Sequence, residues 1–172
     1  MITSSDFDFF LKYGFIKGIS EGSSMDNLLS KYGNDNWYVK HIENNGLIYG
    51  IIKIGFIEFH IYNEKISGIS YRPDLPFSKK DFDGVVIPWI YKSKDISRVE
   101  ECLKIKQIVY KKYTIKGPSS LFSTAGADLM LNDGDSTFID TEGGVTFLFE
   151  TSKKTEQLEA YQICKYYDRH KQ

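Results

Sequence analysis

Hydrophobic and polar residues alternate in four consecutive segments, "WYVKHIE", "LIYGIIKI", "FIEFHIY" and "KISGISYR", which are separated by "NNG", a glycine and "NE". Alternation with period two is typical of half-buried strands, and such short polar connections are typical of tight hairpins. The pattern therefore predicts an antiparallel meander. In its third strand, Glu58, His60 and Tyr62 share one face, and the opposite face is apolar.

Two short helices are predicted before these strands. In "SSDFDFFLKYG", Ser4 or Ser5 can cap a helix that Gly14 closes. In "SEGSSMDNLLSKYG", the serines offer a capping side chain and Gly33 stands where a left-handed residue is wanted.

The same order returns in the second part of the chain. A capping box from Ser97 to Glu100 predicts a longer helix, with an apolar face that extends to Val109 and with Lys111 and Lys112 in its last turn. The strand-like segments "SLFSTA", "DLMLN", "STFID", "VTFLFE" and "LEAYQICKYY" follow, joined by "NDGD", "EGG" and "TSKKTEQ". The Asp-Gly in "NDGD" favours a tight hairpin over a calcium loop, which needs spaced ligands and a terminal glutamate.

These patterns predict an α+β fold of two tandem units, each with helices followed by an antiparallel sheet. "GFIEFHIYNEKISGISYRPD" aligns weakly with "GVTFLFETSKKTEQLEAYQICKYYD", which suggests an internal duplication; a single continuous fold is the alternative. We expect a first half at 1–75, a connecting segment at 76–94 and a second half at 95–172, packed into one globular unit.

Charge is distributed unevenly, although the net charge is −1. Eight basic and three acidic residues lie between Lys92 and Lys116, whereas six acids and no lysine or arginine lie between Lys116 and Lys153. An uncompensated basic face would be expected of a general nucleic-acid binder, so we expect no nucleic-acid partner. The separation permits electrostatic steering of a charged protein partner.

The sequence predicts a cytoplasmic protein without a membrane partner. The N-terminus lacks the basic start of a secretory signal, and Lys53 and Gly55 interrupt the longest apolar run. Cys102 and Cys164 match no metal or redox motif and are predicted to be reduced. We expect no metal and no cofactor, because His41 and His60, which could lie on neighbouring strands, have no cysteine or aspartate pair at ligand spacing.

Catalysis is not expected. Glu58 and His60 share a strand face and could act as acid and base, but alternation produces such pairs on any solvated sheet. The sequence contains no phosphate-binding loop, nucleophile elbow or zinc signature. A small hydrolase or nuclease that uses Glu58 and His60, and a module that binds a small ligand, remain alternatives.

The order "FIKGISEGSSMDNLLSKYG", a strand with Trp37, and "GFIEFHIYNEKISGISYR" resembles the small cytoplasmic immunity proteins of bacterial polymorphic-toxin and contact-dependent growth inhibition systems. The resemblance covers the first 75 residues or so; in the second half, "GGVTFLFE" is its clearest part. The tandem arrangement is also similar to that of the β-lactamase inhibitor protein. The resemblance implies a protein that binds the C-terminal domain of its cognate toxin and blocks it, without chemistry of its own. A monomer is favoured, and the oligomeric state stays open.

Many such toxins are nucleases with basic clefts, so acidic side chains could imitate a phosphate backbone. The residues predicted to bind the toxin are therefore the acids of the lysine-free stretch and the polar strand face: Asp128, Asp133, Asp135, Asp140, Glu142, Trp37, Glu58, His60 and Tyr62. A solvated hairpin that carries acids for solubility is the alternative explanation for the acidic group.

Overall fold

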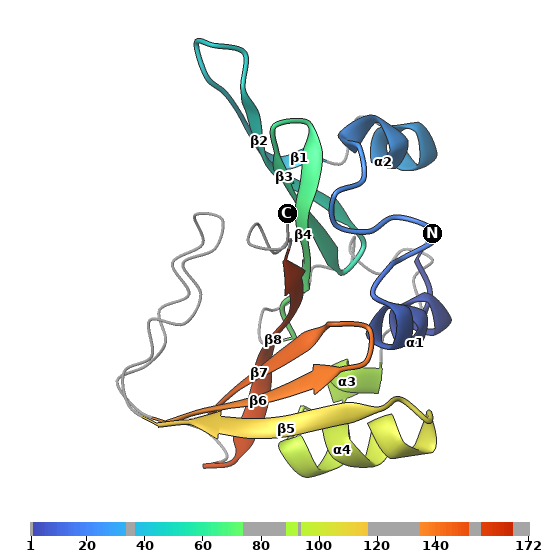
Figure 1. Cartoon of the computed structure of the whole chain (residues 1–172), viewed down its shortest axis with the longest axis vertical. Coiled ribbons are helices and arrows are strands. Elements are labelled where there is room, and N and C mark those ends of the chain that lie inside the picture. The colour runs from blue at the N-terminus through green and yellow to red at the C-terminus, as the bar shows by residue number, and fades with distance from the viewer. Residues whose placement is uncertain are drawn as a thin grey trace.

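The computed structural model describes residues 2–33, 37–73, 89–92, 94–116, 135–151 and 156–166. Its described strands form one antiparallel eight-stranded sheet in the order β1-β2-β3-β4-β8-β7-β6-β5 (Figure 1). The fold is therefore mixed α+β, as the sequence predicts, and the sheet dominates it. Only the pairing of β4 with β8 joins the first four strands to the last four.

The first half begins with α1 (Ser4–Tyr13) and α2 (Met25–Tyr32). The predicted strands follow as β1 (Trp37–Ile42), β2 (Ile48–Ile54), β3 (Ile57–Tyr62) and β4 (Lys65–Tyr71), which confirms the meander. The cap predicted for α1 is wrong, because Thr3 caps it and forms a reciprocal capping box with Asp6. The expected left-handed Gly33 is also wrong, since its φ of 85° is combined with a ψ of 168°.

The second half consists of α3 (Trp89–Lys92), α4 (Ile96–Ile105), β5 (Tyr110–Ile115), β6 (Ser136–Thr141), β7 (Thr146–Thr151) and β8 (Leu158–Tyr166). Asp95, and not Ser97, caps α4 by accepting a hydrogen bond from the Arg98 amide. The predicted extension of this helix to Lys112 is wrong. The helix ends at Ile105, and Lys111 and Lys112 belong to β5.

Three of the predicted segments, "SLFSTA", "DLMLN" and the "NDG" of the expected hairpin, lie outside the described residues. The predicted connection at 76–94 also lies outside the described residues, apart from α3 and Lys94. The turn "EGG" joins β6 to β7, with Gly144 in the left-handed region at a φ of 72°.

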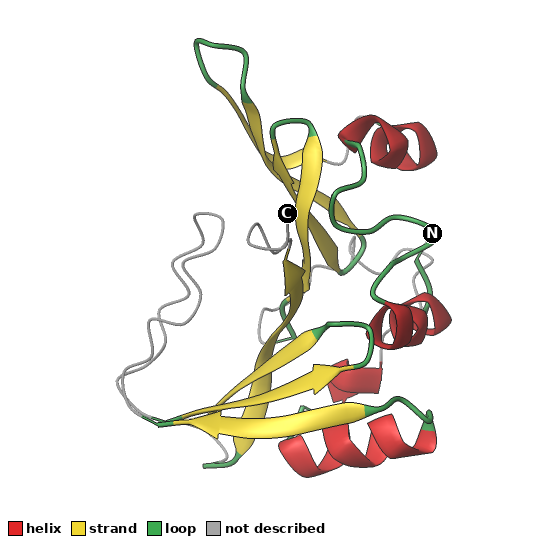
Figure 2. Cartoon of the chain, viewed as in Figure 1, coloured by secondary structure: helices red, strands yellow, loops and turns green. Residues whose placement is uncertain are grey.

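The described helices all lie on one side of the sheet (Figure 2). The main hydrophobic core lies between these helices and the sheet, and it includes Phe7, Phe10, Phe59 and Phe147. A smaller cluster contains Phe138, Leu148 and Cys164, whose strands place them on the opposite, helix-free face. Among the described residues, apolar clusters therefore lie on both faces of the second half of the sheet and on one face of the first.

Helix α1 connects the two halves. Its Asp8 accepts hydrogen bonds from Trp89 Nε1 at 2.9 Å and from Lys106 Nζ at 2.6 Å. At its C-terminus, the Gly14 carbonyl accepts a hydrogen bond from Lys165 Nζ on β8 at 3.2 Å. A helix encoded in the first half is thus anchored to the second.

Candidate binding face

One row of side chains on the helix-free face crosses the sheet from β2 to β5. Each member lies opposite the next in the strand register: Lys53, Glu58, Ser70, Cys164, Thr146, Asp140 and Lys111. The row places Glu58 and Asp140, which the sequence predicts in two separate groups, on one face of one sheet. The central pair, Ser70 and Cys164, separates them.

A second row on this face is aromatic. His41 on β1 lies opposite Tyr49 on β2, and Tyr49 lies opposite Tyr62 on β3. The rings of His41 and Tyr49 stack at 5.0 Å between centroids. The tyrosines are 36% and 43% exposed. The three rings form a continuous, solvent-accessible aromatic row near the end of β3.

Between the two rows, a hydrogen-bonded chain joins His60, Ser70 and Glu58. His60 Nε2 and Ser70 Oγ are 2.8 Å apart, and Ser70 Oγ donates to Glu58 Oε2 at 3.3 Å. The roles of donor and acceptor in the shorter contact depend on the tautomer of the His60 ring. Burial lowers the pKa of His60 from 6.5 to about 4, so the ring is neutral near pH 7.

This chain gives little support to a hydrolase. A serine nucleophile must be accessible to its substrate, whereas Ser70 is only 1% exposed, so a substrate cannot reach its hydroxyl in this conformation. The arrangement is better explained as a satisfied polar network within the sheet.

Asp140 is held by its neighbours in the second half. Thr146 Oγ1 donates to Asp140 Oδ1 at 2.7 Å. Burial, together with the charge of Asp140 and a hydrogen bond to it, raises the pKa of Tyr113 to about 12. Asp140 also lies opposite Lys111. Its carboxylate is therefore engaged within the sheet and is not an isolated surface charge.

The other predicted site residues are dispersed. Trp37 packs against the main core, because a bulge between Trp37 and Val39 shifts the register of β1. Glu142, in the turn after β6, accepts a hydrogen bond from the Val109 amide at 3.2 Å. Asp135 is exposed immediately before β6, and Asp128 and Asp133 lie outside the described residues.

The prediction that His41 and His60 could lie on neighbouring strands is wrong, because β2 lies between β1, which carries His41, and β3, which carries His60. Within the described residues, no group of three or more histidine, cysteine, aspartate or glutamate side chains could hold a metal ion. Cys102 and Cys164 are free thiols, and burial raises the pKa of Cys164 to about 12.

Sequence reasoning missed Tyr49 and Ser70. The alternation in "LIYGIIKI" could have placed Tyr49 on the same face as Lys53, and the "NE" turn could have set Tyr49 opposite Tyr62. Ser70 has no comparable local signal, since its role depends on the bulge that shifts β4 against β3 after His60.

Comparisons with protein-family models, with curated proteins and with solved structures find no match. Among the described residues, no helix is both long enough and apolar enough to span a membrane.

Proposed function

We propose that the protein is a cytoplasmic immunity protein, which binds the toxic domain of a bacterial toxin through the helix-free face of its sheet and thereby blocks it. The observation that carries this proposal is the exposed aromatic row of His41, Tyr49 and Tyr62. Tyrosine combines a large contact area with a low entropic cost of ordering, and binding hot spots are enriched in it. The resemblance of the first 75 residues or so to immunity proteins supports the same function.

The charges on this face suit a specific protein partner. Lys53 lies opposite Glu58 in the first half, and Lys111 lies opposite Asp140 in the second. Alternating charges of this kind favour one complementary surface and reject others, since like charges in contact cost several kcal/mol. The described acids Asp135, Asp140 and Glu142 are dispersed, so imitation of a phosphate backbone contributes less to the proposal than the aromatic row does.

The proposal is tested by co-expression with the toxic C-terminal domain encoded beside this protein. Growth should be rescued, and the two chains should co-purify in a one-to-one complex. The double variant Tyr49→Ala/Tyr62→Ala removes two adjacent exposed rings and should weaken the complex by at least about tenfold. Affinity is measured by calorimetry or biolayer interferometry.

Tyr91→Ala is the matched control, because Tyr91 is also 36% exposed but belongs to α3 on the helix side of the sheet. It should leave both affinity and rescue unchanged. Rescue without any complex would argue against direct neutralisation. A complex that tolerates the double variant but loses affinity in the control would place the interface on the other side.

We also propose that the two halves arose by duplication of one α+β unit. Each half contributes a four-stranded antiparallel meander, β1–β4 and β5–β8, and the corresponding strands take mirrored positions in the sheet order. The antiparallel pairing of β4 with β8, with Ser70 opposite Cys164, is compatible with a two-fold axis between the halves.

The bulges support the same equivalence. Glu58 lies opposite Ser70, and Thr146 lies opposite Cys164. In each half the register shifts immediately after the residue two positions further on, which is His60 in β3 and Leu148 in β7. Superposing β1–β4 on β5–β8 in an experimental structure should therefore bring His60 onto Leu148. A best fit in another register would contradict the duplication.

A further inference from the structure

A second exposed aromatic cluster lies on the opposite side of the molecule, at the C-terminal part of α1. The ring centroids of Phe9 and Tyr13 are 4.3 Å apart, and those of Phe9 and Phe15 are 5.2 Å apart. Phe9 is 47% and Tyr13 is 49% exposed, although both belong to a helix whose other face enters the core. A contiguous group of solvent-exposed aromatic side chains is typical of a protein or ligand contact surface and not of an ordinary solvated helix face.

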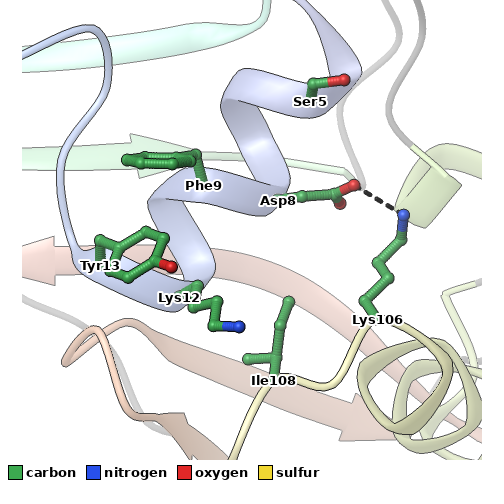
Figure 3. Close-up of a pocket in the computed structure, with 7 residues that line it drawn as sticks. All are labelled: Ser5, Asp8, Phe9, Lys12, Tyr13, Lys106 and Ile108. Carbon is green, nitrogen blue, oxygen red and sulfur yellow. Dashed lines mark hydrogen bonds and ion pairs between the residues drawn. The ribbon is translucent and has the colours of Figure 1, made fainter.

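A depression of about 300 Å³ adjoins these rings, between α1 and the chain that follows α4 (Figure 3). Ile108, which is almost completely buried, contributes apolar surface, and Phe9 and Tyr13 line one side. Lys12 extends between Tyr13 and Ile108, and Lys106 lies on the side away from the rings, where it meets Asp8 (Figure 3). This volume lies at the lower end of the roughly 300–1,000 Å³ that is usual for ligand sites, and it suits one or two side chains of a partner.

The charges of the two lysines are compensated differently. Lys106 Nζ donates to Asp8 Oδ2 at 2.6 Å, so its charge is neutralised inside the depression. Lys12 forms no ion pair with any of the described residues; its ammonium lies 5.8 Å from the centroid of the Tyr13 ring. Among the described residues, Lys12 is therefore the lysine of this depression that has no carboxylate partner. It stands beside an apolar and aromatic surface, so the complementary group is a carboxylate next to an apolar side chain.

We propose that this depression is a second binding site, which takes an acidic and hydrophobic segment of a partner protein. An aromatic or aliphatic side chain of the segment contacts Ile108 and Phe9, and a neighbouring carboxylate pairs with Lys12. The site lies on the helix side of the sheet, so it leaves the aromatic row of His41, Tyr49 and Tyr62 accessible and does not depend on the function proposed for that row.

The test uses the full chain and a defined probe, the acetylated and amidated tetrapeptide Glu-Phe-Leu-Asp, with Gln-Phe-Leu-Asn as its uncharged analogue. In a ¹⁵N-correlation NMR titration, the acidic peptide should shift the amide signals of residues 5–13 and 106–109 with a dissociation constant on the order of millimolar. The uncharged analogue should bind about threefold more weakly, which is the usual effect of one exposed ion pair.

Lys12→Gln should remove the difference between the two peptides, and Phe9→Ala should remove binding. Lys104→Gln is the matched control, because Lys104 belongs to α4 but does not line the depression, and it should bind as the unaltered chain does. The dispersion of the NMR signals shows in the same spectra whether each variant is folded.

Three results would overturn the proposal. They are the absence of shifts with the acidic peptide, equal affinity for both peptides, and shifts confined to the strands. A concentration-dependent dimer in sedimentation velocity that Phe9→Ala abolishes would assign the surface to a second copy of this chain instead. Tighter binding of free 3-phenylpropanoate than of the acidic peptide would indicate a small-molecule site.

Discussion

At the scale of single residues, His60 couples the stability of the sheet to pH. Its pKa is about 4 in the folded protein and 6.5 in the unfolded chain, so the unfolded state binds more protons between these values. Its contribution to stability is complete above about pH 6.5 and is lost as the pH falls towards 4, by up to about 3 kcal/mol. His60→Gln keeps a hydrogen-bonding group for Ser70 and cannot titrate. Its free energy of unfolding should therefore change less between pH 7 and pH 4 than that of the unaltered protein.

Chemical denaturation at a series of pH values measures this effect. His41→Gln is the control, because His41 stacks on Tyr49 at the solvent-exposed part of the same face, and it should keep the pH dependence of the unaltered protein. Parallel pH profiles for His60→Gln and the unaltered protein would show that His60 takes up its proton over the same pH range in the folded and unfolded states, and would contradict the prediction.

At the scale of elements, the end of α1 depends on a glycine for two separate reasons. Gly14 has a φ of 76°, and a Cβ atom there would collide with the Gly143 carbonyl and with Lys165 Nζ. Gly46, in the turn between β1 and β2, has a comparable φ of 83° but has nothing within 4 Å of the same position. Gly46→Ala should therefore cost about 1 kcal/mol for the backbone conformation alone.

Gly14→Ala should cost clearly more, at least about 2 kcal/mol, because a backbone carbonyl cannot move aside as a flexible side chain can. Urea denaturation of both variants measures the difference. Equal costs would mean that α1 can shift away from the turn between β6 and β7 without loss, and that it does not bind the two halves together tightly.

The sequence predicts elements well where local patterns agree and poorly where they conflict. The first four strands follow from alternation and short turns. The segment after Leu103 carries Ile105, Ile108 and Val109 at helix-like spacing, yet the chain reverses at Gln107, which adopts a positive φ of 56°. Glutamine is an unusual residue for that conformation, so no local signal indicated that the helix ends or that β5 begins.

Which residues share the candidate face was predictable only in part, because local alternation fixes the face within one strand but not the pairing of distant strands. Alternation alone places Glu58, His60 and Tyr62 together. That Asp140 shares their face depends on the pairing of β4 with β8, which joins residues far apart in the chain and is set by the whole sheet. Trp37 and Glu142 lie away from the face for local reasons, because the bulge in β1 turns Trp37 towards the core and Glu142 lies in the turn after β6.

At the scale of the whole molecule, the central β4–β8 pair and helix α1 should make the two halves unfold together. The chain has two tryptophans. Trp37 reports on the first half through β1, whereas Trp89 reports on the junction, where its ring lies 6.3 Å from Phe7 and its Nε1 donates to Asp8. The single-tryptophan variants Trp89→Phe and Trp37→Phe separate these two signals.

In each variant, the fluorescence transition in urea should coincide with the transition that circular dichroism records for the same chain, because a cooperative unit loses all its contacts at once. Coincidence in both would show that the strands on either side of the β4–β8 pair share one stability. If Trp37 reported an earlier transition than circular dichroism, the first half would open while the second stayed folded. The exposed aromatic row would then be carried by the less stable part of the sheet, and a bound partner would stabilise that half selectively by mass action.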